Sequence, residues 1–273
     1  MTHEVVSNGA TFVRLTDEMA SDSPTLVASQ NFLLQWLEGS NHSASFSSDE
    51  ETVVILACGT ARLTGSSWSA GMEGPAVAIV PAGQNDLRLE SGTAVILATQ
   101  RSDVARSEAL NAPLAADGRV AAVGHPMTRK RPLASAEVIK VADLAPPPDN
   151  GRLRFLQSAT MSVNFVLYDG PRGSDSLSPH AHDDIEQGTL ALAGDYVHHL
   201  RTPWGRDASE WRDDVHLPAG RGTLLLIPPE LVHTTEGVGT GQHMLVDIFA
   251  PPRRDFIAKG WMANAGDYAE NGA

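Results

Sequence analysis

The chain has 273 residues, of which 42% are apolar and 19% charged, with 24 glycines and 17 prolines. This composition is typical of a globular protein rich in turns and excludes a fragment, a disordered chain and a coiled coil. A formal net charge of -13 repels phosphate backbones and anionic lipid headgroups, so we expect neither nucleic acid nor a membrane as a partner.

The N-terminus and the cysteine content indicate a cytoplasmic location. Residues 1–8 contain neither the basic region nor the apolar stretch of a secretory signal. The single thiol, Cys58, cannot form an intramolecular disulfide, as expected in a reducing compartment. No apolar run approaches the roughly 18 residues that span a bilayer.

Short apolar segments that end near Gly, Pro or Asn recur along the chain and predict strands. No segment sustains the period of 3.6 residues that would predict a long helix. An all-β fold is therefore expected. The predicted strands cover residues 52–58, 76–80 and 93–99 in the first half and residues 188–193, 223–227 and 244–249 in the second.

The two series of strands match in spacing, which indicates an internal duplication. Glu51 precedes Gly59 by eight positions, just as Glu186 precedes Gly194 by eight. Similar elements at matched spacing are the mark of repeated structural units.

A segment of different composition separates the two series. Residues 106–150 mix Ala, Pro and Gly and contain one further strand candidate at 137–141. We therefore expect an N-terminal unit at residues 1–118 and a C-terminal unit at residues 119–273, joined through a linker at about 106–150.

Histidines are concentrated in the second series, where seven of the ten lie between residues 180 and 243. Side chains two apart on an extended chain share a face, so His180 and His182 can converge on one point. Glu186 stays in phase with them if the strand remains extended, and His233 follows the strand at 223–227. Three imidazoles and a carboxylate suit Fe, Mn, Ni, Co or Zn. We predict one divalent transition metal bound by His180, His182, Glu186 and His233.

The same residues resemble the two sequence motifs of the cupin superfamily. The first motif matches through the histidine pair and Glu186, and the second through Gly222, Pro228 and His233. The resemblance implies two antiparallel cupin barrels, or jelly rolls, in one chain, with the metal inside the second. The departures from the family pattern are Gly173 and Gly194, each one residue out of place, Glu230 in place of Gly, and Gly237 in place of Asn.

The first copy departs further from the motif. The spacing of the second copy places Ser45 and Ser47 where the histidine pair would be, and Asp86 where His233 would be. One carboxylate and two hydroxyls hold a transition metal poorly. We therefore expect an N-terminal barrel without metal ligands, with a structural or dimerising role.

The predicted strand at 243–249 has two unlike faces. His243 and Asp247 share one face, while the opposite face is purely apolar and should pack against a neighbouring layer. Asp247 is therefore predicted to point into the barrel with His243. A carboxylate near a dication can move a proton, and a structural aspartate paired with an arginine is the alternative.

Residues 247–253 resemble the end of the pectin-degradation cupins, which open the ring of unsaturated uronates. That resemblance implies Asp247, Phe249 and Arg253 as site residues, and Gln187 as an extra ligand or polar contact. The guanidinium of Arg253 suits a substrate carboxylate, although a pair with Asp255 would also satisfy it. With Tyr196 added, the candidate substrate contacts are Gln187, Phe249 and Tyr196, and the candidate catalytic residues are Asp247, His243 and Arg253.

The sequence is consistent with three functional classes. The leading one is a non-redox metal enzyme, an isomerase, lyase or hydrolase, acting on a small oxygenated or carboxylated, sugar-acid-like substrate. An Fe-dependent dioxygenase is the alternative, because three histidines, a carboxylate and open positions also suit O₂ chemistry. The third is a small-molecule-binding bicupin without turnover. A homodimer is one option for the assembly.

Overall fold

A computed structural model describes residues 1–16, 24–99 and 106–269. Antiparallel strands are the dominant secondary structure of these ranges, and this confirms the predicted all-β class. Within the same ranges, no helix has both the length and the apolar character needed to cross a membrane.

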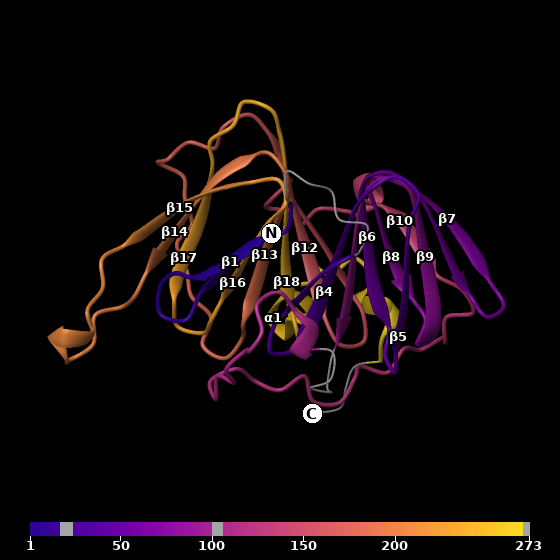
Figure 1. Cartoon of the computed structure of the whole chain (residues 1–273), viewed down its shortest axis with the longest axis horizontal. Coiled ribbons are helices and arrows are strands. Elements are labelled where there is room, and N and C mark those ends of the chain that lie inside the picture. The colour runs from indigo at the N-terminus through magenta and orange to yellow at the C-terminus, as the bar shows by residue number, and fades with distance from the viewer. Residues whose placement is uncertain (17–23, 100–105, 270–273) are drawn as a thin grey trace.

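A seven-stranded sheet lies in the middle of the molecule (Figure 1). It combines strands from both ends of the chain, and all of its pairings are antiparallel. In spatial order it contains β1 (Thr2–Val5), β2 (Thr11–Arg14), β16 (Thr223–Ile227), β13 (Gln187–Ala193), β18 (Gln242–Phe249), β12 (Ser162–Asp169) and β11 (Leu153–Gln157).

A three-stranded sheet covers one face of this central sheet. It contains β15 (Val215–Gly220), β14 (Asp195–Arg201) and β17 (Val232–Gly237). Between the two sheets lies a buried apolar cluster that includes Phe12, Tyr196 and Leu225. These two sheets therefore form the C-terminal barrel, and the strand that carries His233 belongs to its outer wall.

An eight-stranded sheet forms the N-terminal half of the molecule. Its longest strands, β6 and β9, change register against each other where the sheet bends. Gly59 and Gly92 lie at this bend with φ of +84° and +97°, and a Cβ on either would come within 2.0 Å of a facing backbone carbonyl oxygen. The sheet contains β10 (Glu137–Lys140), β8 (Ala76–Val80), β6 (Thr52–Gly65), β9 (Gly83–Thr99), β4 (Phe32–Gly39) and β3 (Thr25–Ala28), with β5 (His42–Ser48) on β9 and β7 (Ser69–Glu73) on β6.

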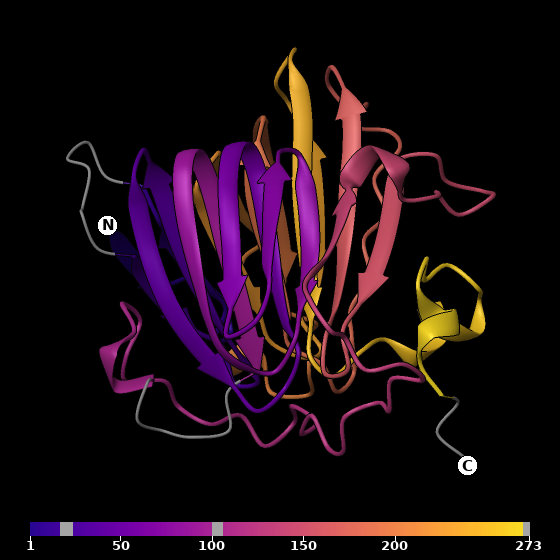
Figure 2. The same ribbon diagram turned by 90° about the vertical axis from the view of Figure 1, so that its right-hand side faces the viewer.

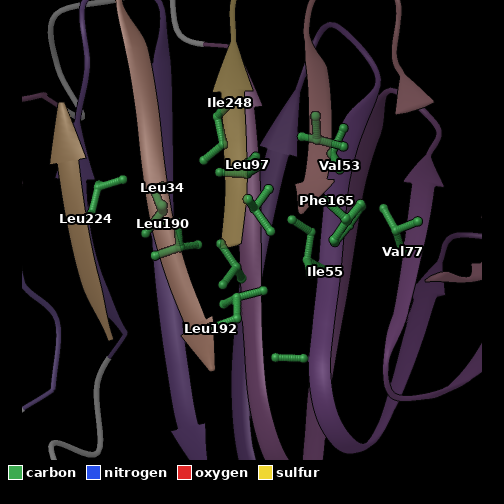
Figure 3. Packing of buried hydrophobic residues seen from close by; sticks show 14 of the residues in the cluster. Leu34, Val53, Ile55, Val77, Leu97, Phe165, Leu190, Leu192, Leu224 and Ile248 are labelled. Carbon is green, nitrogen blue, oxygen red and sulfur yellow. The ribbon is translucent and has the colours of Figure 1, made fainter. Parts of the chain in front are cut away.

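The largest apolar cluster lies between the N-terminal sheet and the central sheet. Figure 3 shows Leu34, Val53 and Ile55 from one sheet facing Leu190 and Ile248 from the other. Each of these side chains is fully or almost fully buried. Burial of each large apolar side chain contributes about 1.5–3 kcal/mol to stability. This layer is therefore the main source of stabilisation between the two halves.

The central strands confirm the predicted alternation. Met244, Val246 and Ile248 of β18 face the layer between the sheets. Their neighbours Leu245 and Asp247 point the other way, into the C-terminal barrel. This alternation is what delivers polar side chains to the interior of that barrel.

The sheets do not divide at residue 118. Strand β2 pairs with β16, so the N-terminus belongs to the C-terminal barrel, whereas the linker strand β10 pairs with β8 of the N-terminal sheet. The connecting segment that follows residue 106 runs along one end of the strands (Figure 2). Strands β2 and β10 each cover a strand edge that would otherwise expose unpaired backbone groups. The composition of the sequence does not indicate which half of the molecule these strands join.

The position of β2 in the C-terminal barrel predicts how two substitutions affect stability. Phe12 of β2 is 1% exposed inside the C-terminal barrel, whereas Val5 of β1 is 70% exposed. We expect Phe12→Ala to lower the free energy of unfolding by about 3–5 kcal/mol, because it leaves a cavity. Val5→Ala should change it by less than about 0.5 kcal/mol. Urea denaturation measures both, and a loss below about 1 kcal/mol for Phe12→Ala would contradict the placement of β2 in this core.

Candidate metal centre

Three histidines meet at one end of the C-terminal barrel. His180 and His182 lie in the segment between β12 and β13, and His233 lies on β17. One ring nitrogen of each is within 4.8 Å of the others. Backbone hydrogen bonds from His180 N to His233 O (3.1 Å) and from His233 N to His180 O (2.8 Å) hold two of them opposite each other.

The backbone fixes the tautomer of two of these rings. Nδ1 of His180 lies 2.9 Å from the carbonyl oxygen of Ser178, and Nδ1 of His233 lies 2.9 Å from that of Leu231. A carbonyl oxygen only accepts, so both Nδ1 atoms carry the proton and donate. Each Nε2 atom is then left with a lone pair, the form in which imidazole binds a metal.

Burial keeps two of the histidines neutral. It lowers the pKa of His233 to about 3. It also lowers the pKa of His182 to about 4, with a further contribution from the positive charge of Arg253. At pH 7 both imidazoles are therefore unprotonated, as ligation requires.

The amide of Gln187 completes the group. Its Oε1 lies 2.9 Å from Nε2 of His182 and 3.3 Å from Nε2 of His233. Its Nε2 donates to Oγ1 of Thr189 (2.8 Å) and to Oδ1 of Asp247 (3.1 Å). These two acceptors orient the amide so that its oxygen is the atom that faces the histidines.

Glu186, the predicted fourth ligand, does not lie with the histidines. Its Oε2 accepts a hydrogen bond of 2.8 Å from the backbone N–H of Gln30, in the N-terminal half. The prediction assumed an extended chain after His182, but the chain bends at residues 183–184, and the strand starts only at Gln187. Adjacent strand residues face opposite sides, so Gln187 points inward and Glu186 does not.

The sequence held a signal for this correction. In the family motif the ligand after the histidine pair is followed by six residues and then Gly. Gly194 is one residue out of place when counted from Glu186, but it fits when counted from Gln187, seven positions before it.

The donor set fits a divalent transition metal. The Nε2 lone pair of His233 and Oε1 of Gln187 are both acceptors, and they face each other at 3.3 Å with no proton to share. A cation bound to both would satisfy them. Three imidazoles and one amide oxygen match Mn, Fe, Ni or Zn better than Mg or Ca, which prefer oxygen.

A cavity of about 220 Å³ opens beside the histidines. Phe249, a predicted contact, lies in its wall, with its ring edge-on to His182 at a centroid distance of 5.6 Å. Several polar and aromatic residues that the sequence did not indicate also line the cavity. They come from loops, from strands with no distinctive pattern and, for Phe256, from the short helix α1 (Arg254–Ala258). They include Arg152, Asn164, Arg172, Phe155, Phe256 and Trp261.

Asp247 lines this cavity as predicted. Its Oδ1 accepts hydrogen bonds from Thr189 Oγ1 (3.0 Å) and Gln187 Nε2 (3.1 Å), and its Oδ2 accepts one from Asn164 Nδ2 (3.2 Å). Burial raises the pKa of Asp247, against these hydrogen bonds, which favour the carboxylate.

His243 and Tyr196 lie outside the cavity, contrary to their predicted roles. His243 is fully buried, stacked on Tyr168 at 4.6 Å and edge-on to Tyr196 at 5.0 Å. Asp247 lies four positions further along the strand, which is about 13 Å, so sharing a face does not bring the two side chains together. The hydroxyl of Tyr196 donates to the carbonyl oxygen of Ala193 (2.7 Å), which makes Tyr196 a structural residue of the neighbouring turn.

Arg253 contacts the histidine cluster from behind rather than from the cavity. Its Nη1 donates to Nδ1 of His182 (3.0 Å), so the proton of that neutral ring lies on Nε2, which donates to Oε1 of Gln187 (2.9 Å). A metal bound through Nε2 of His182 would displace this proton. Two hydrogen bonds, of 2.7 and 2.8 Å, tie its guanidinium to the carboxylate of Asp255, and the same group packs over the ring of Phe256 at 4.4 Å. Of the two partners expected for Arg253, a substrate carboxylate and Asp255, the structure shows Asp255.

The two residues that the spacing placed at histidine positions in the first half, Ser45 and Asp86, lie opposite each other in the N-terminal sheet. Ser45 on β5 pairs directly with Asp86 on β9, as His180 pairs with His233, and its hydroxyl donates to Oδ1 of Asp86 at 2.5 Å.

Comparison with known proteins adds evidence on the fold. No protein-family model matches the sequence, and no curated protein sequence matches it. Protein YlbA from E. coli superposes with a TM-score of 0.59 at 11% identity, over 91% of this chain and 93% of its own. The oxalate decarboxylase of Lactobacillus farciminis, in a formate complex, gives 0.54 at 12% identity, over 92% and 88%. The oxalate decarboxylase of Bacillus subtilis, described with Mn(II) centres, gives 0.51 at 9% identity, over 92% and 79%.

These neighbours define the fold of the chain. They have the cupin fold, and similarity at this level of identity establishes the architecture alone. The chain therefore has the fold of the cupin superfamily, and its three-histidine group is a candidate site for a divalent metal.

The geometry predicts which of two adjacent residues supports metal binding. We expect Gln187→Leu to weaken Mn(II) binding by at least about tenfold, because it removes an oxygen that faces two of the histidines. Glu186→Gln should leave Mn(II) affinity unchanged, since that carboxylate lies on the other side of the strand. Equilibrium titration followed by Mn(II) electron paramagnetic resonance measures both, and the reverse order of effects would restore Glu186 as the ligand.

Proposed function

We propose that the chain is a metal-dependent cupin enzyme that moves a proton on a small hydroxylated carboxylate, as an isomerase or lyase acting on a sugar-acid-like substrate. One observation carries the proposal: the carboxylate of Asp247 and the three histidines share one small cavity, with two arginines in its wall. Such convergence of metal ligands, a carboxylate and cations is typical of a catalytic site.

The residues that would hold the metal are His180, His182, His233 and Gln187. When bound, a divalent metal would supply Lewis-acid polarisation of a substrate oxygen. Asp247 accepts a hydrogen bond from the amide of Gln187, so the same carboxylate that orients this ligand also faces the cavity.

Oδ2 of Asp247 is the atom proposed to move the proton. Oδ1 already accepts from two donors, whereas Oδ2 accepts only from Asn164 among the residues described. A lone pair on Oδ2 is therefore available to take a proton from a substrate carbon or hydroxyl and to return it at a neighbouring atom.

Two arginines in the cavity wall favour a substrate that carries a carboxylate. The guanidinium of Arg172 donates to Ser176 O (2.5 Å) and Ser178 Oγ (3.2 Å), and within the described ranges neither Arg152 nor Arg172 forms an ion pair. Burial lowers the pKa of Arg172, and the charge of Arg152 lowers it further. Two cations that repel each other in one cavity wall favour an anion, and guanidinium pairs well with carboxylate.

The other residues of the cavity wall favour a substrate with a hydroxylated ring. Oδ1 of Asn164 is buried, with no hydrogen-bond partner among the described residues, and can accept from a substrate hydroxyl. Phe155, Phe256 and Trp261 pack together at centroid distances of 4.7 to 5.6 Å and give the cavity an aromatic side. An aromatic wall excludes water and packs against the apolar face of a ring.

A substrate screen tests the proposal. The purified chain, loaded separately with Mn, Zn or Fe, would be incubated with uronates, other hydroxy acids and diketones, with oxygen consumption recorded in parallel. We expect turnover of a hydroxylated carboxylate without oxygen uptake. Oxygen-dependent turnover of a diketone by the Fe form would favour the dioxygenase instead. Tight binding without any product would favour the binding protein.

Replacement of Asp247 tests its role as proton carrier. We expect Asp247→Asn to lower kcat by roughly 10² to 10⁴, the usual range for a general acid or base. Metal affinity and fold should persist, because the Asn oxygen can still accept from Gln187, and Asn164 can turn its free oxygen towards the new amide. Steady-state kinetics at fixed metal occupancy measures the loss. An unchanged kcat combined with a lower melting temperature would make Asp247 structural.

Replacement of Arg172 tests the carboxylate contact. We expect Arg172→Met to raise KM for the carboxylate substrate by about 10- to 100-fold with a smaller effect on kcat, because a charge-assisted hydrogen bond is lost. Arg254→Met is the matched control, since Arg254 is exposed and does not line the cavity. Equal effects of the two substitutions would show that only the overall charge matters.

A further inference from the structure

A second pair of histidines lies on the outer face of the three-stranded sheet. His199 on β14 and His216 on β15 are direct partners in the antiparallel register. Their Nδ1 atoms are 2.7 Å apart and their ring centroids 4.9 Å apart. His198 and Leu200, the neighbours of His199, are buried inside the barrel, so this pair faces away from the cavity that holds the first three histidines.

A carboxylate orients one ring of this pair. Oε2 of Glu236, on β17, lies 3.2 Å from Nε2 of His199. An ionised carboxylate only accepts, so Nε2 of His199 carries the proton, and its Nδ1 presents a lone pair to His216. A carboxylate that holds the far nitrogen of an imidazole is the usual partner of a histidine ligand, because it fixes the tautomer and raises the basicity of the ligating nitrogen.

From this arrangement we propose that His199 and His216 form a second transition-metal site, with Glu236 as the orienting residue. Two imidazole nitrogens that bind one metal at about 2.0–2.1 Å lie roughly 2.9–3.3 Å apart. The observed 2.7 Å needs only a small opening, which the exposed ring of His216 can provide. Imidazole nitrogens favour Zn(II), Ni(II) or Cu(II), with water in the remaining positions.

The site would join two strands of a projecting hairpin. The loop that connects β14 and β15 projects from the rest of the molecule (Figure 1), and β14 also pairs with β17, which carries His233. A metal held across β14 and β15 would stabilise this hairpin. Because its ligands point outward, the site does not depend on the proposed catalytic function.

Zinc titration of a chain without the first centre tests the proposal. In the His180→Ala/His182→Ala double variant, isothermal titration with Zn(II) alone should still find one equivalent. Adding His216→Ala should remove that equivalent, and adding Glu236→Gln should weaken it by about 10- to 100-fold. His125→Ala, an exposed histidine outside both groups, is the matched control and should have no effect.

The wild-type chain provides an independent comparison that does not require the double variant to fold. Two equivalents of Zn(II) should fall to one in His216→Ala, and the melting temperature with Zn(II) should rise less in that variant than in the wild type. A double variant that binds no Zn(II), or binding that His216→Ala leaves intact, would overturn the second site.

Discussion

The alternation of side chains on the central sheet is the constraint on which the rest of the structure depends. On β13 and β18, residues that pack against the N-terminal sheet alternate with residues that point into the C-terminal barrel. Leu190, Val246 and Ile248 hold the two halves together, and Gln187 and Asp247 thereby face the histidines. A shift of one residue in either strand would place polar groups in the apolar layer and remove them from the cavity.

The polar groups of the cavity form hydrogen bonds with one another, because they are buried and have little access to water. Asp247 accepts from Gln187, Gln187 contacts His182 and His233, and the backbone carbonyl of Leu231 fixes the ring of His233. Each link in this chain selects the orientation of the next. The same contacts that satisfy buried polar atoms therefore also orient the two atoms that face each other without a shared proton, Nε2 of His233 and Oε1 of Gln187.

Much of the fold could be predicted from the sequence, because buried strands leave an apolar pattern. The six predicted strands are observed within β6, β8, β9, β13, β16 and β18. Strands such as β5, β15 and β17 were missed, since they carry polar side chains on one or both faces. The histidine group was predictable because His-x-His spacing is rare, and Asp247 because it interrupts an apolar strand.

The rest of the site depends on features that periodicity does not record. The bend before β13 moves the inward position from Glu186 to Gln187, and strand length separates His243 from Asp247. Arg152 and Arg172 reach the cavity from loops that contain no motif. Anomalous X-ray diffraction from crystals grown with Mn(II) tests the central claim most directly. The account predicts one peak within bonding distance of His180, His182, His233 and Oε1 of Gln187. A peak beside Glu186, or none at the three histidines, would contradict it.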